Sequence, residues 1–416
     1  MGIFDRKYLS AAQLAGFDNY KYNCIDTSPI AVYISHPFWN WLVQFYPEWL
    51  APNVLTLSGA MLVMGCYWLV SFMDPNLTAN SYGNSPDQWL PNWIWLVCSI
   101  CTFAGHTLDG TDGKQARRTG ASGPTGELFD HGLDSWATVP FTITIFSVFG
   151  QGEFSVSPVR LLGILISVQL VFIVTHWEKN ATGVMFLSWA YDASQYGLSL
   201  FYLFVYIVGH QWFQFYVFGT FSFAQCFEMG FYICCVMSFI MSFWNMYDAY
   251  FVHKTGRQNN FYEFLLPMFS PTILFTASVY WARNSPSNVI DKDPRLFLWA
   301  MGAVFSNIAV HLIIAQMSCT RPETFNVLLR IYLVVAGLSL TGLFGDAEIL
   351  VLWFIAIALT LAHMHYGICL VRQLCDHFKI HAFDLKYLKS KKKTPLRYDL
   401  PSNCPIAELT SPDDSD

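Results

Sequence analysis

Residues 108–136 read LDGTDGKQARRTGASGPTGELFDHGLDSW and decide the fold, because they concentrate charge beside long apolar runs. The stretch contains four aspartates, one glutamate, one histidine and three basic residues. The neighbouring apolar runs cover 90–108 and 129–149, and each is close to the roughly 20 residues that span the hydrocarbon of a bilayer. The stretch therefore predicts two membrane helices whose charged ends meet at one membrane surface.

The whole chain has the composition of a polytopic membrane protein. Of its 416 residues, 54% are hydrophobic and only 12% are charged, whereas an ordinary soluble domain has about 25% charged residues. The composition and the recurring apolar runs predict an all-α polytopic membrane protein with about ten transmembrane helices and an N-terminal interfacial helix. We expect the spans at 54–73, 90–108, 129–149, 158–177, 184–209, 229–249, 263–282, 296–317, 327–345 and 349–371.

Three regions follow from this pattern. Residues 1–50 form a cytosolic N-terminal and interfacial segment, because HPFWNWLVQFYPEWL at 36–50 is too short to span and is rich in tryptophan. Residues 51–378 form the transmembrane domain. Residues 379–416 form a cytosolic tail that is first basic and then acidic, a composition typical of disorder.

The lysines and arginines predict the orientation, because short cytoplasmic loops retain them. With ten spans, one side carries the tail sequence KYLKSKKK and most other basic residues. The other side carries only Arg160, Arg283, Lys292 and Arg295. Both termini and the stretch 108–136 should therefore face the cytosol. The eleven cysteines are scattered and show no spacing typical of a zinc site or a disulfide framework.

The four aspartates of the stretch have the spacing of a metal site. Asp109 and Asp112 are three residues apart, and Asp130 and Asp134 are four apart, so each pair shares one helix face. Carboxylates crowded near hydrocarbon repel one another unless cations are present. Hard oxygen ligands favour Mg²⁺ or Mn²⁺, and four aspartates are enough for two ions that hold a phosphate.

Glycines and basic residues of the same stretch suit a phosphate ligand. Gly110, Gly113 and Gly126 would let a phosphate approach the backbone closely. Lys114 and Arg117 would complement its charge. The alternative for any single residue here is an ordinary charge at a membrane surface.

The spacing as a whole matches a family pattern. The pattern D-x2-D-G-x2-A-R-x8-G-x3-D-x3-D is met by Asp109, Asp112, Gly113, Ala116, Arg117, Gly126, Asp130 and Asp134. The chain thus resembles the CDP-alcohol phosphotransferases, membrane enzymes that move a phospho-alcohol from a CDP carrier onto a lipid or polyol hydroxyl. The resemblance implies a metal-dependent active site at the cytosolic face of the helices.

The resemblance covers nearly all of the span region. QLAGFDNYKYNCIDTSPI at 13–30, HWEKNATG at 176–183 and LAHMHYG at 361–367 are similar to the eukaryotic choline and ethanolamine phosphotransferases. The segment HWEKNATGVMFLSWAYDASQ at 176–195 is more similar to the ethanolamine-selective branch. The implied reaction converts CDP-ethanolamine and diacylglycerol to phosphatidylethanolamine and CMP, in a membrane of the endoplasmic reticulum or Golgi.

Two alternatives accompany this interpretation. The nearer one is a choline or dual-specificity enzyme with the same chemistry. The other is a membrane transporter or a non-catalytic scaffold, although transporters commonly place their coupling residues near the bilayer midplane, whereas these carboxylates lie at one edge. The expected partners are CDP-ethanolamine, diacylglycerol and membrane lipid, with no nucleic acid, and a homodimer is left open.

The resemblance also implies roles for the substrate-binding residues. Asn53 and Thr56 in PNVLT resemble the element that lines the nucleotide site in this superfamily, and helix capping is the alternative. Gly113, Ala116 and Arg117 correspond to positions that hold the CDP group. Glu178 is a candidate partner for the ammonium of the substrate or else a solvated loop charge, and Asp192, backed by Trp189 and Tyr191, is a second candidate.

His131 is the candidate general base. It lies between two of the aspartates, and the ordinary pKa of histidine, about 6.5, suits proton transfer near neutral pH. Glu127 lies four residues earlier on the same helix face and could orient the imidazole ring. The alternatives are Asp134 as the base, and a histidine that caps the loop or binds phosphate.

Overall fold

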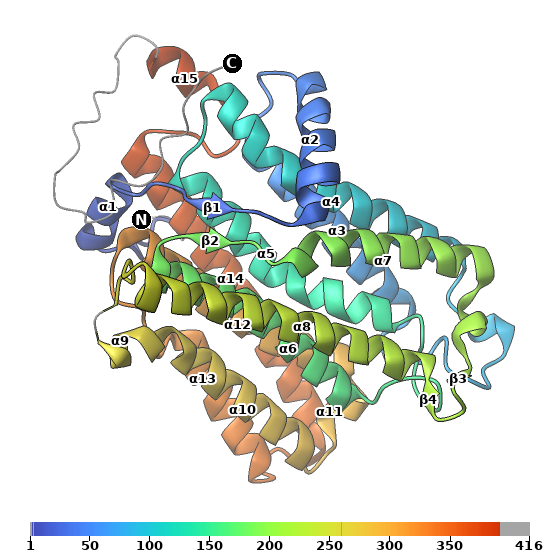
Figure 1. Cartoon of the computed structure of the whole chain (residues 1–416). Coiled ribbons are helices and arrows are strands. Elements are labelled where there is room, and N and C mark those ends of the chain that lie inside the picture. Colours follow the sequence, from blue (N-terminus) through green and yellow to red (C-terminus); the bar gives the residue numbers. More distant parts are fainter. Residues whose placement is uncertain (1, 3, 259, 392–416) are drawn as a thin grey trace.

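The protein is a bundle of long helices (Figure 1). The computed structural model describes residues 2, 4–258 and 260–391. Its α-helices are α1 (Ala11–Asp18), α2 (His36–Leu42), α3 (Pro52–Met73), α4 (Trp93–Thr119), α5 (Pro124–Phe146), α6 (Pro158–Thr182), α7 (Trp189–Val208), α8 (Phe223–Tyr247), α9 (Phe261–Leu265), α10 (Phe269–Asn284), α11 (Val289–Lys292), α12 (Pro294–Ser318), α13 (Val327–Leu340), α14 (Glu348–Phe378) and α15 (Lys386–Lys391). The only strands in these ranges are β1 (Cys24–Ile25), β2 (Met185–Phe186), β3 (Tyr216–Val217) and β4 (Phe221–Ser222).

The helices confirm an all-α membrane protein. Six helical segments of the described chain are long and apolar enough to cross a bilayer by length and composition: 52–73, 158–182, 223–252, 261–284, 294–318 and 345–378. The other four predicted spans also fall on helices, namely α4, α5, α7 and α13. Of these, α4 carries charges near its end and α13 has only 14 residues. The count of ten spans therefore stays a prediction.

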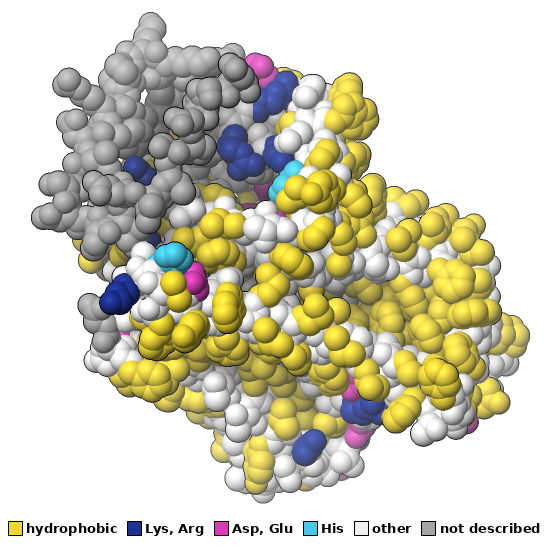
Figure 2. All heavy atoms as spheres, in the orientation of Figure 1, with side chains coloured by type: hydrophobic (Ala, Val, Ile, Leu, Met, Phe, Trp, Pro, Cys, Tyr) yellow, Lys and Arg dark blue, Asp and Glu magenta, His cyan; other side chains and the backbone are white. Residues whose placement is uncertain are grey.

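The surface agrees with an integral membrane protein. Figure 2 shows a broad hydrophobic area over the long helices, with charged side chains gathered mainly toward the end that carries the N-terminal segment. The short helix α2 belongs to this end, and Trp41 and Trp49 near it are 56% and 76% exposed. Exposed tryptophans of this kind favour the membrane interface, as expected for residues 36–50.

A tight turn joins α4 to α5 and brings their aspartates side by side. Gly120 ends α4 with a φ of 74°, a left-handed conformation that glycine adopts without a steric cost. Its N–H bonds the carbonyls of Ala116 and Arg117. Pro124 then opens α5 at a position where a helix has no need of an N–H donor. The two helices run antiparallel from this turn, and α3 packs against both.

Helix α12 lies at the centre of the bundle, and nearly all of its side chains are buried. Gly302 lets α12 approach α5 closely, because a Cβ at this position would lie 2.1 Å from Cγ2 of Val139. Val139 is itself fully buried, so it has no free space into which to move.

We expect Gly302→Ala to lower stability. The added methyl group overpacks the contact with Val139, and such changes cost about 1–3 kcal/mol. The measurement is the thermal unfolding midpoint of the purified protein in lipid nanodiscs. Gly367→Ala in α14 is the matched control, because a Cβ there meets nothing within 4 Å. Equal midpoints for the two variants would contradict the close packing of α12 on α5.

The N-terminal segment lies across the polar end of the bundle. β1 pairs in parallel with β2, which follows α6, and α1 packs on α12. Nε2 of His377, near the end of α14, is 2.7 Å from Oδ1 of Asp18. The short helix α15 lies within the tail that was predicted to be disordered. The rest of that prediction, residues 392–416, lies outside the described residues.

Candidate active site

One large cavity opens among α3, α4, α5, α6, α7 and the N-terminal segment. Its volume is about 1200 Å³. At the polar end its wall includes the aspartates of α4 and α5, and deeper in the bundle it includes apolar side chains such as Val63, Phe141 and Val168. Phe17 and Tyr20 from the N-terminal segment and Leu385 from beyond α14 also contribute to the wall. The cavity thus joins a charged end to an apolar interior.

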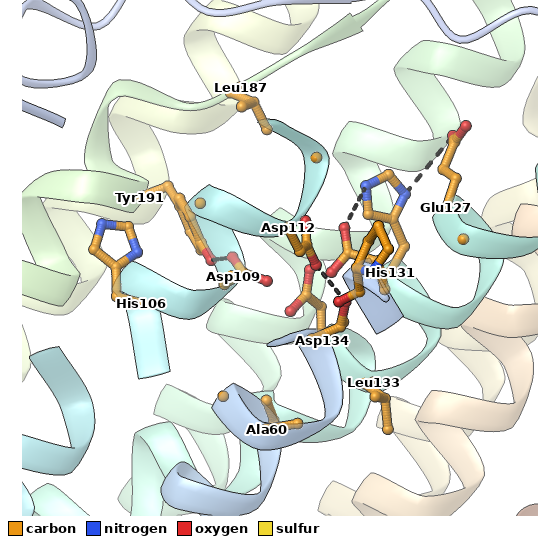
Figure 3. Close-up of a pocket in the computed structure, with 18 of the residues that line it drawn as sticks. Ala60, His106, Asp109, Asp112, Glu127, His131, Leu133, Asp134, Leu187 and Tyr191 are labelled. Atoms are coloured by element: carbon orange, nitrogen blue, oxygen red, sulfur yellow. Dashed lines mark hydrogen bonds and ion pairs between the residues drawn. The ribbon is translucent and has the colours of Figure 1, made fainter. Parts of the chain in front are cut away.

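The four aspartates line this cavity together (Figure 3). Asp109, Asp112 and Asp130 each offer a carboxylate oxygen, and these oxygens lie within 4.8 Å of one another. We call these three residues the carboxylate cluster. Asp134 lies one helical turn deeper on α5 than Asp130 and is not part of this close group, although it lines the same cavity. The expected cup of four carboxylates is therefore a close group of three with a fourth beside it.

The carboxylate cluster fits a divalent metal ion. Oδ1 of Asp130 is buried and accepts no hydrogen bond within the described chain. Thr56 Oγ1 donates a hydrogen bond to Oδ2 of Asp112, and Tyr191 donates one to Oδ2 of Asp109 over 3.0 Å. Each of these two contacts leaves carboxylate lone pairs for another partner. Hard oxygen donors at this spacing suit Mg²⁺ or Mn²⁺.

Most of the residues expected to hold the nucleotide also line the cavity. The residues of this set that line the cavity are Asn53, Thr56, Gly113, Ala116, Arg117 and Gly126. A Cβ added at Gly126 would lie 3.5 Å from Oδ1 of Asn53, so this amide faces α5 across the cavity mouth. Thr56 contacts the carboxylate cluster directly, which supports a role in the site rather than simple capping.

The structure places two of the residues expected to bind phosphate, Lys114 and Gly110, in different surroundings. Lys114 is not among the residues that line the cavity, although Arg117, three residues later on α4, is. Gly110 lines the cavity and also packs against α2, since a Cβ there would lie 2.4 Å from the ring of Trp39. The small residue lets α2 lie against α4, and Arg117 remains as the basic residue at the mouth.

His131 lies in the cavity wall, but Glu127 does not hold it by a hydrogen bond. Its Nδ1 is 3.9 Å from Oε1 of Glu127, and its Nε2 is 3.8 Å from Oδ2 of Asp130. Glu127 instead accepts a hydrogen bond from Tyr20 over 2.7 Å and pairs with Lys179. Burial and the neighbouring Glu127 raise the pKa of Tyr20, so this phenol stays a neutral donor. Glu127 and His131 are therefore close enough for an ion pair, but they do not form the expected orienting hydrogen bond.

Glu178 is placed differently from the expectation. It lies within α6 rather than in a loop, it is fully buried, and it does not line the cavity. Its Oε1 accepts a hydrogen bond from Asn245 of α8 over 2.8 Å. The helix continues to Thr182 before Gly183 ends it with a φ of 85°. The segment from His176 to Thr182 is therefore helical, and Glu178 on its far face cannot meet a ligand in the cavity.

The structure adds residues that the sequence interpretation did not select. Lys179 is 3% exposed and lies over the rings of Tyr20 and Tyr22 at 5.5 and 5.1 Å. The ring of His176 lies 5.3 Å from that of His131. A lysine and a histidine three residues apart in an apolar helix were a usable signal, because ionisable residues within membrane helices are commonly functional.

Fold and site together define a membrane-embedded helical protein that presents acidic metal ligands to one cavity. The family model described as CDP-alcohol phosphatidyltransferase matches residues 49–236, a range that contains the carboxylate cluster. The chain belongs to this family.

Its relatives agree along nearly the whole length. The chain is 42% identical over 385 residues to Ethanolaminephosphotransferase 1 of Homo sapiens, which covers 91% of this chain and 95% of the human protein. It is 43% identical over 385 residues to Ethanolaminephosphotransferase 1 of Mus musculus, with the same coverage. Cholinephosphotransferase 1 of Rattus norvegicus is more distant, at 26% identity over 411 residues that cover 94% of this chain and 95% of the rat protein. The protein is therefore a phosphotransferase enzyme, and the transporter and scaffold alternatives are set aside.

Proposed function

We propose that the protein transfers phosphoethanolamine from CDP-ethanolamine to diacylglycerol, giving phosphatidylethanolamine and CMP. The observation that carries this proposal is the single cavity that joins the carboxylate cluster to an apolar interior. One reactant is a charged nucleotide and the other is a lipid, so the site must offer both environments. The similarity to Ethanolaminephosphotransferase 1 of Homo sapiens favours ethanolamine over choline as the head group.

The reaction needs one bond to form and one to break. The free hydroxyl oxygen of diacylglycerol bonds to the phosphorus that carries ethanolamine, and the bond from this phosphorus to the CMP oxygen breaks. The attacking oxygen and the leaving oxygen lie roughly in line. The hydroxyl proton passes to a base, for which His131 is our candidate because its ring lies in the cavity wall beside the carboxylate cluster.

Different residues at the polar end of the cavity would bind the metal ions, the nucleotide and the phosphates. Asp109, Asp112, Asp130 and Asp134 would hold two divalent ions, Mg²⁺ or Mn²⁺, which when bound would offset the charge of the phosphates and of the leaving CMP. Gly113 and Ala116 present a small surface to the nucleotide, and Arg117 lies at the mouth to pair with phosphate. Tyr191 fixes Asp109 through its hydrogen bond.

We place the cavity mouth and both termini in the cytosol of an endoplasmic reticulum or Golgi membrane. The charge asymmetry of the loops supports this orientation. Residues 1–50 form the interfacial segment, 51–378 the transmembrane domain and 379–416 the cytosolic tail. Diacylglycerol stays in the bilayer, so the cavity receives it from the membrane and CDP-ethanolamine from the cytosol.

We expect the purified protein to prefer CDP-ethanolamine to CDP-choline. The measurement is kcat/KM for each donor in lipid nanodiscs with diacylglycerol and Mn²⁺, and the expected ratio is at least about 10, the effect of one good hydrogen bond to a charged group. A preference for CDP-choline would refute the head-group assignment and leave the reaction class intact. Equal rates would identify a dual-specificity enzyme.

A further inference from the structure

A second polar group lines the cavity beside the carboxylate cluster, where α2, α4 and α7 meet. It consists of Asp26, His36, His106 and Asp192, and we call these four residues the side pocket. Asp192 is only 5% exposed. Its Oδ2 accepts a hydrogen bond from Ser35 over 2.7 Å, and Tyr196 in turn donates to Ser35 over 3.2 Å. This carboxylate is therefore held in place at the cavity wall.

None of the four side-pocket residues is a lysine or arginine, although the charges of Lys114 and Arg117 act on its His36. The described wall of the cavity contains eight carboxylate side chains but a single lysine or arginine, Arg117. Lys114 is on the same helix but outside the wall. Burial raises the pKa of Asp26, and the nearby charge of Asp192 raises it further, whereas the bond from the Ser28 N–H and the nearby His36 lower it. Two carboxylates whose charges act on each other at one cavity wall are best satisfied by a positively charged ligand.

A buried histidine of the side pocket has unused hydrogen-bonding capacity. His106 is 4% exposed, and neither of its ring nitrogens has a hydrogen-bond partner in the described chain. Its Nε2 lies 3.4 Å from Oδ1 of Asp192, so both groups face the same space. Buried polar atoms without partners are unfavourable. A ligand that donates several N–H bonds would satisfy both residues at once.

The side pocket is directly connected to the carboxylate cluster. His106 and Asp109 are three residues apart on α4 and share a face. Tyr191 precedes Asp192 on α7 and donates its hydrogen bond to Asp109. Figure 3 shows His106, Tyr191 and Asp109 side by side at one edge of the cavity. A two-carbon arm on a phosphate at the carboxylate cluster would therefore reach the side pocket within about one helical turn, roughly 5.4 Å.

We propose that the side pocket binds the primary ammonium of the CDP-alcohol, with Asp192 as its principal acceptor. This inference rests on the proposed function and adds the residues that select the head group. A primary ammonium has three N–H donors and can bond Asp192, Asp26 and His106 together. A quaternary ammonium has no donor and gains chiefly from aromatic faces. The rings of Trp39 and Tyr191 lie 5.2 and 5.7 Å from His106, so choline would retain those contacts but not the hydrogen bonds.

The test is Asp192→Asn, which keeps the shape and removes the charge. We expect KM for CDP-ethanolamine to rise about 10- to 100-fold, the worth of hydrogen bonds to a charged acceptor, while kcat/KM for CDP-choline changes less than about threefold. Binding of CMP, which has no ammonium, should be unchanged by isothermal titration calorimetry. Ser35→Ala keeps the charge of Asp192 and removes the hydrogen bond that Ser35 donates to it. This variant should lower the preference for CDP-ethanolamine over CDP-choline, but by less than Asp192→Asn.

Two matched variants separate selectivity from folding. Glu178→Gln neutralises another buried carboxylate that lies outside the cavity, and Asp376→Asn neutralises an exposed one at the end of α14. Neither variant should change the ratio of kcat/KM for CDP-ethanolamine to kcat/KM for CDP-choline. The assignment would be overturned if Asp192→Asn lost activity equally with CDP-ethanolamine and CDP-choline and also lost CMP binding. An unchanged ratio of the two activities in Asp192→Asn would overturn it as well. So would a selective loss of activity with CDP-ethanolamine in Glu178→Gln.

The proposed function can fail separately. If the wild-type protein turned over neither donor, the reaction would be refuted, but calorimetry would still compare CDP-ethanolamine with CMP. A gain in affinity from the aminoethyl group that disappears in Asp192→Asn supports the side pocket under either outcome. No such gain in the wild-type protein would overturn it.

Discussion

Asp109→Ala, Asp112→Ala and Asp130→Ala should each reduce turnover of CDP-ethanolamine by at least about three orders of magnitude. The three carboxylate oxygens lie within 4.8 Å of one another, so each contributes to the same candidate metal site. Removal of one charged ligand leaves the ion with too few donors, and metal ions supply several kcal/mol of stabilisation in reactions of this class. Each 1.36 kcal/mol corresponds to about a tenfold change in rate.

Asp134→Ala decides whether the fourth aspartate belongs to the same site. It lies in the cavity but outside the close group of three. We expect the same loss, because two ions need more donors than three aspartates provide. A loss of less than about tenfold would instead indicate one ion held by Asp109, Asp112 and Asp130.

These variants need a readout besides turnover. Binding of Mn²⁺, followed by electron paramagnetic resonance of the purified protein, should weaken in each of them and stay normal in Asp376→Asn. Thermal unfolding midpoints will show whether the bundle remains folded. Full activity of the wild-type protein in excess chelator would refute metal dependence outright, and unchanged Mn²⁺ binding in all four variants would move the metal site elsewhere.

Local spacing was enough to predict that these aspartates lie close together. Residues three or four apart on a helix must share a face, so Asp109 with Asp112, and Asp130 with Asp134, had to project together. The glycine turn between the helices then brings the pairs side by side. Apolar runs of spanning length located the long helices for a similar reason, because hydrocarbon requires every backbone group to be bonded within the helix.

Contacts between distant parts of the chain could not be predicted in this way. The position of Glu178 depends on where α6 ends, and the helix continues one turn past the predicted boundary to Thr182. The side pocket combines residues from α2, α4, α7 and the N-terminal segment, so no single stretch of sequence reveals it. Likewise, Tyr20 reaches Glu127 across 107 positions of the chain. Such pairings follow from tertiary packing, on which local periodicity carries no information.

The role of His131 depends on one of these distant contacts. The orienting residue was expected to be Glu127 alone, but Glu127 is shared with Tyr20 and Lys179. Nδ1 of His131 is buried without a hydrogen-bond partner in the described chain, while its ring lies against that of His176. The imidazole is therefore confined by packing, and one of its nitrogens is available to a ligand. This arrangement suits a base that meets the lipid hydroxyl only when substrate is bound.

His131→Ala should lower kcat by roughly two to four orders of magnitude, the usual worth of general base catalysis, while CDP-ethanolamine still binds. Single-turnover kinetics and calorimetric nucleotide binding measure the two effects separately. Tyr20→Phe removes only the 2.7 Å hydrogen bond to Glu127, so it should lose less than about tenfold. The loss of kcat in Glu127→Gln should fall between those of these two variants, because it also leaves buried Lys179 without its carboxylate.

Near-normal chemistry in His131→Ala would return the role of base to Asp134. Loss of CDP-ethanolamine binding would make His131 a substrate ligand, since a pure base contributes to the transition state and not to ground-state affinity.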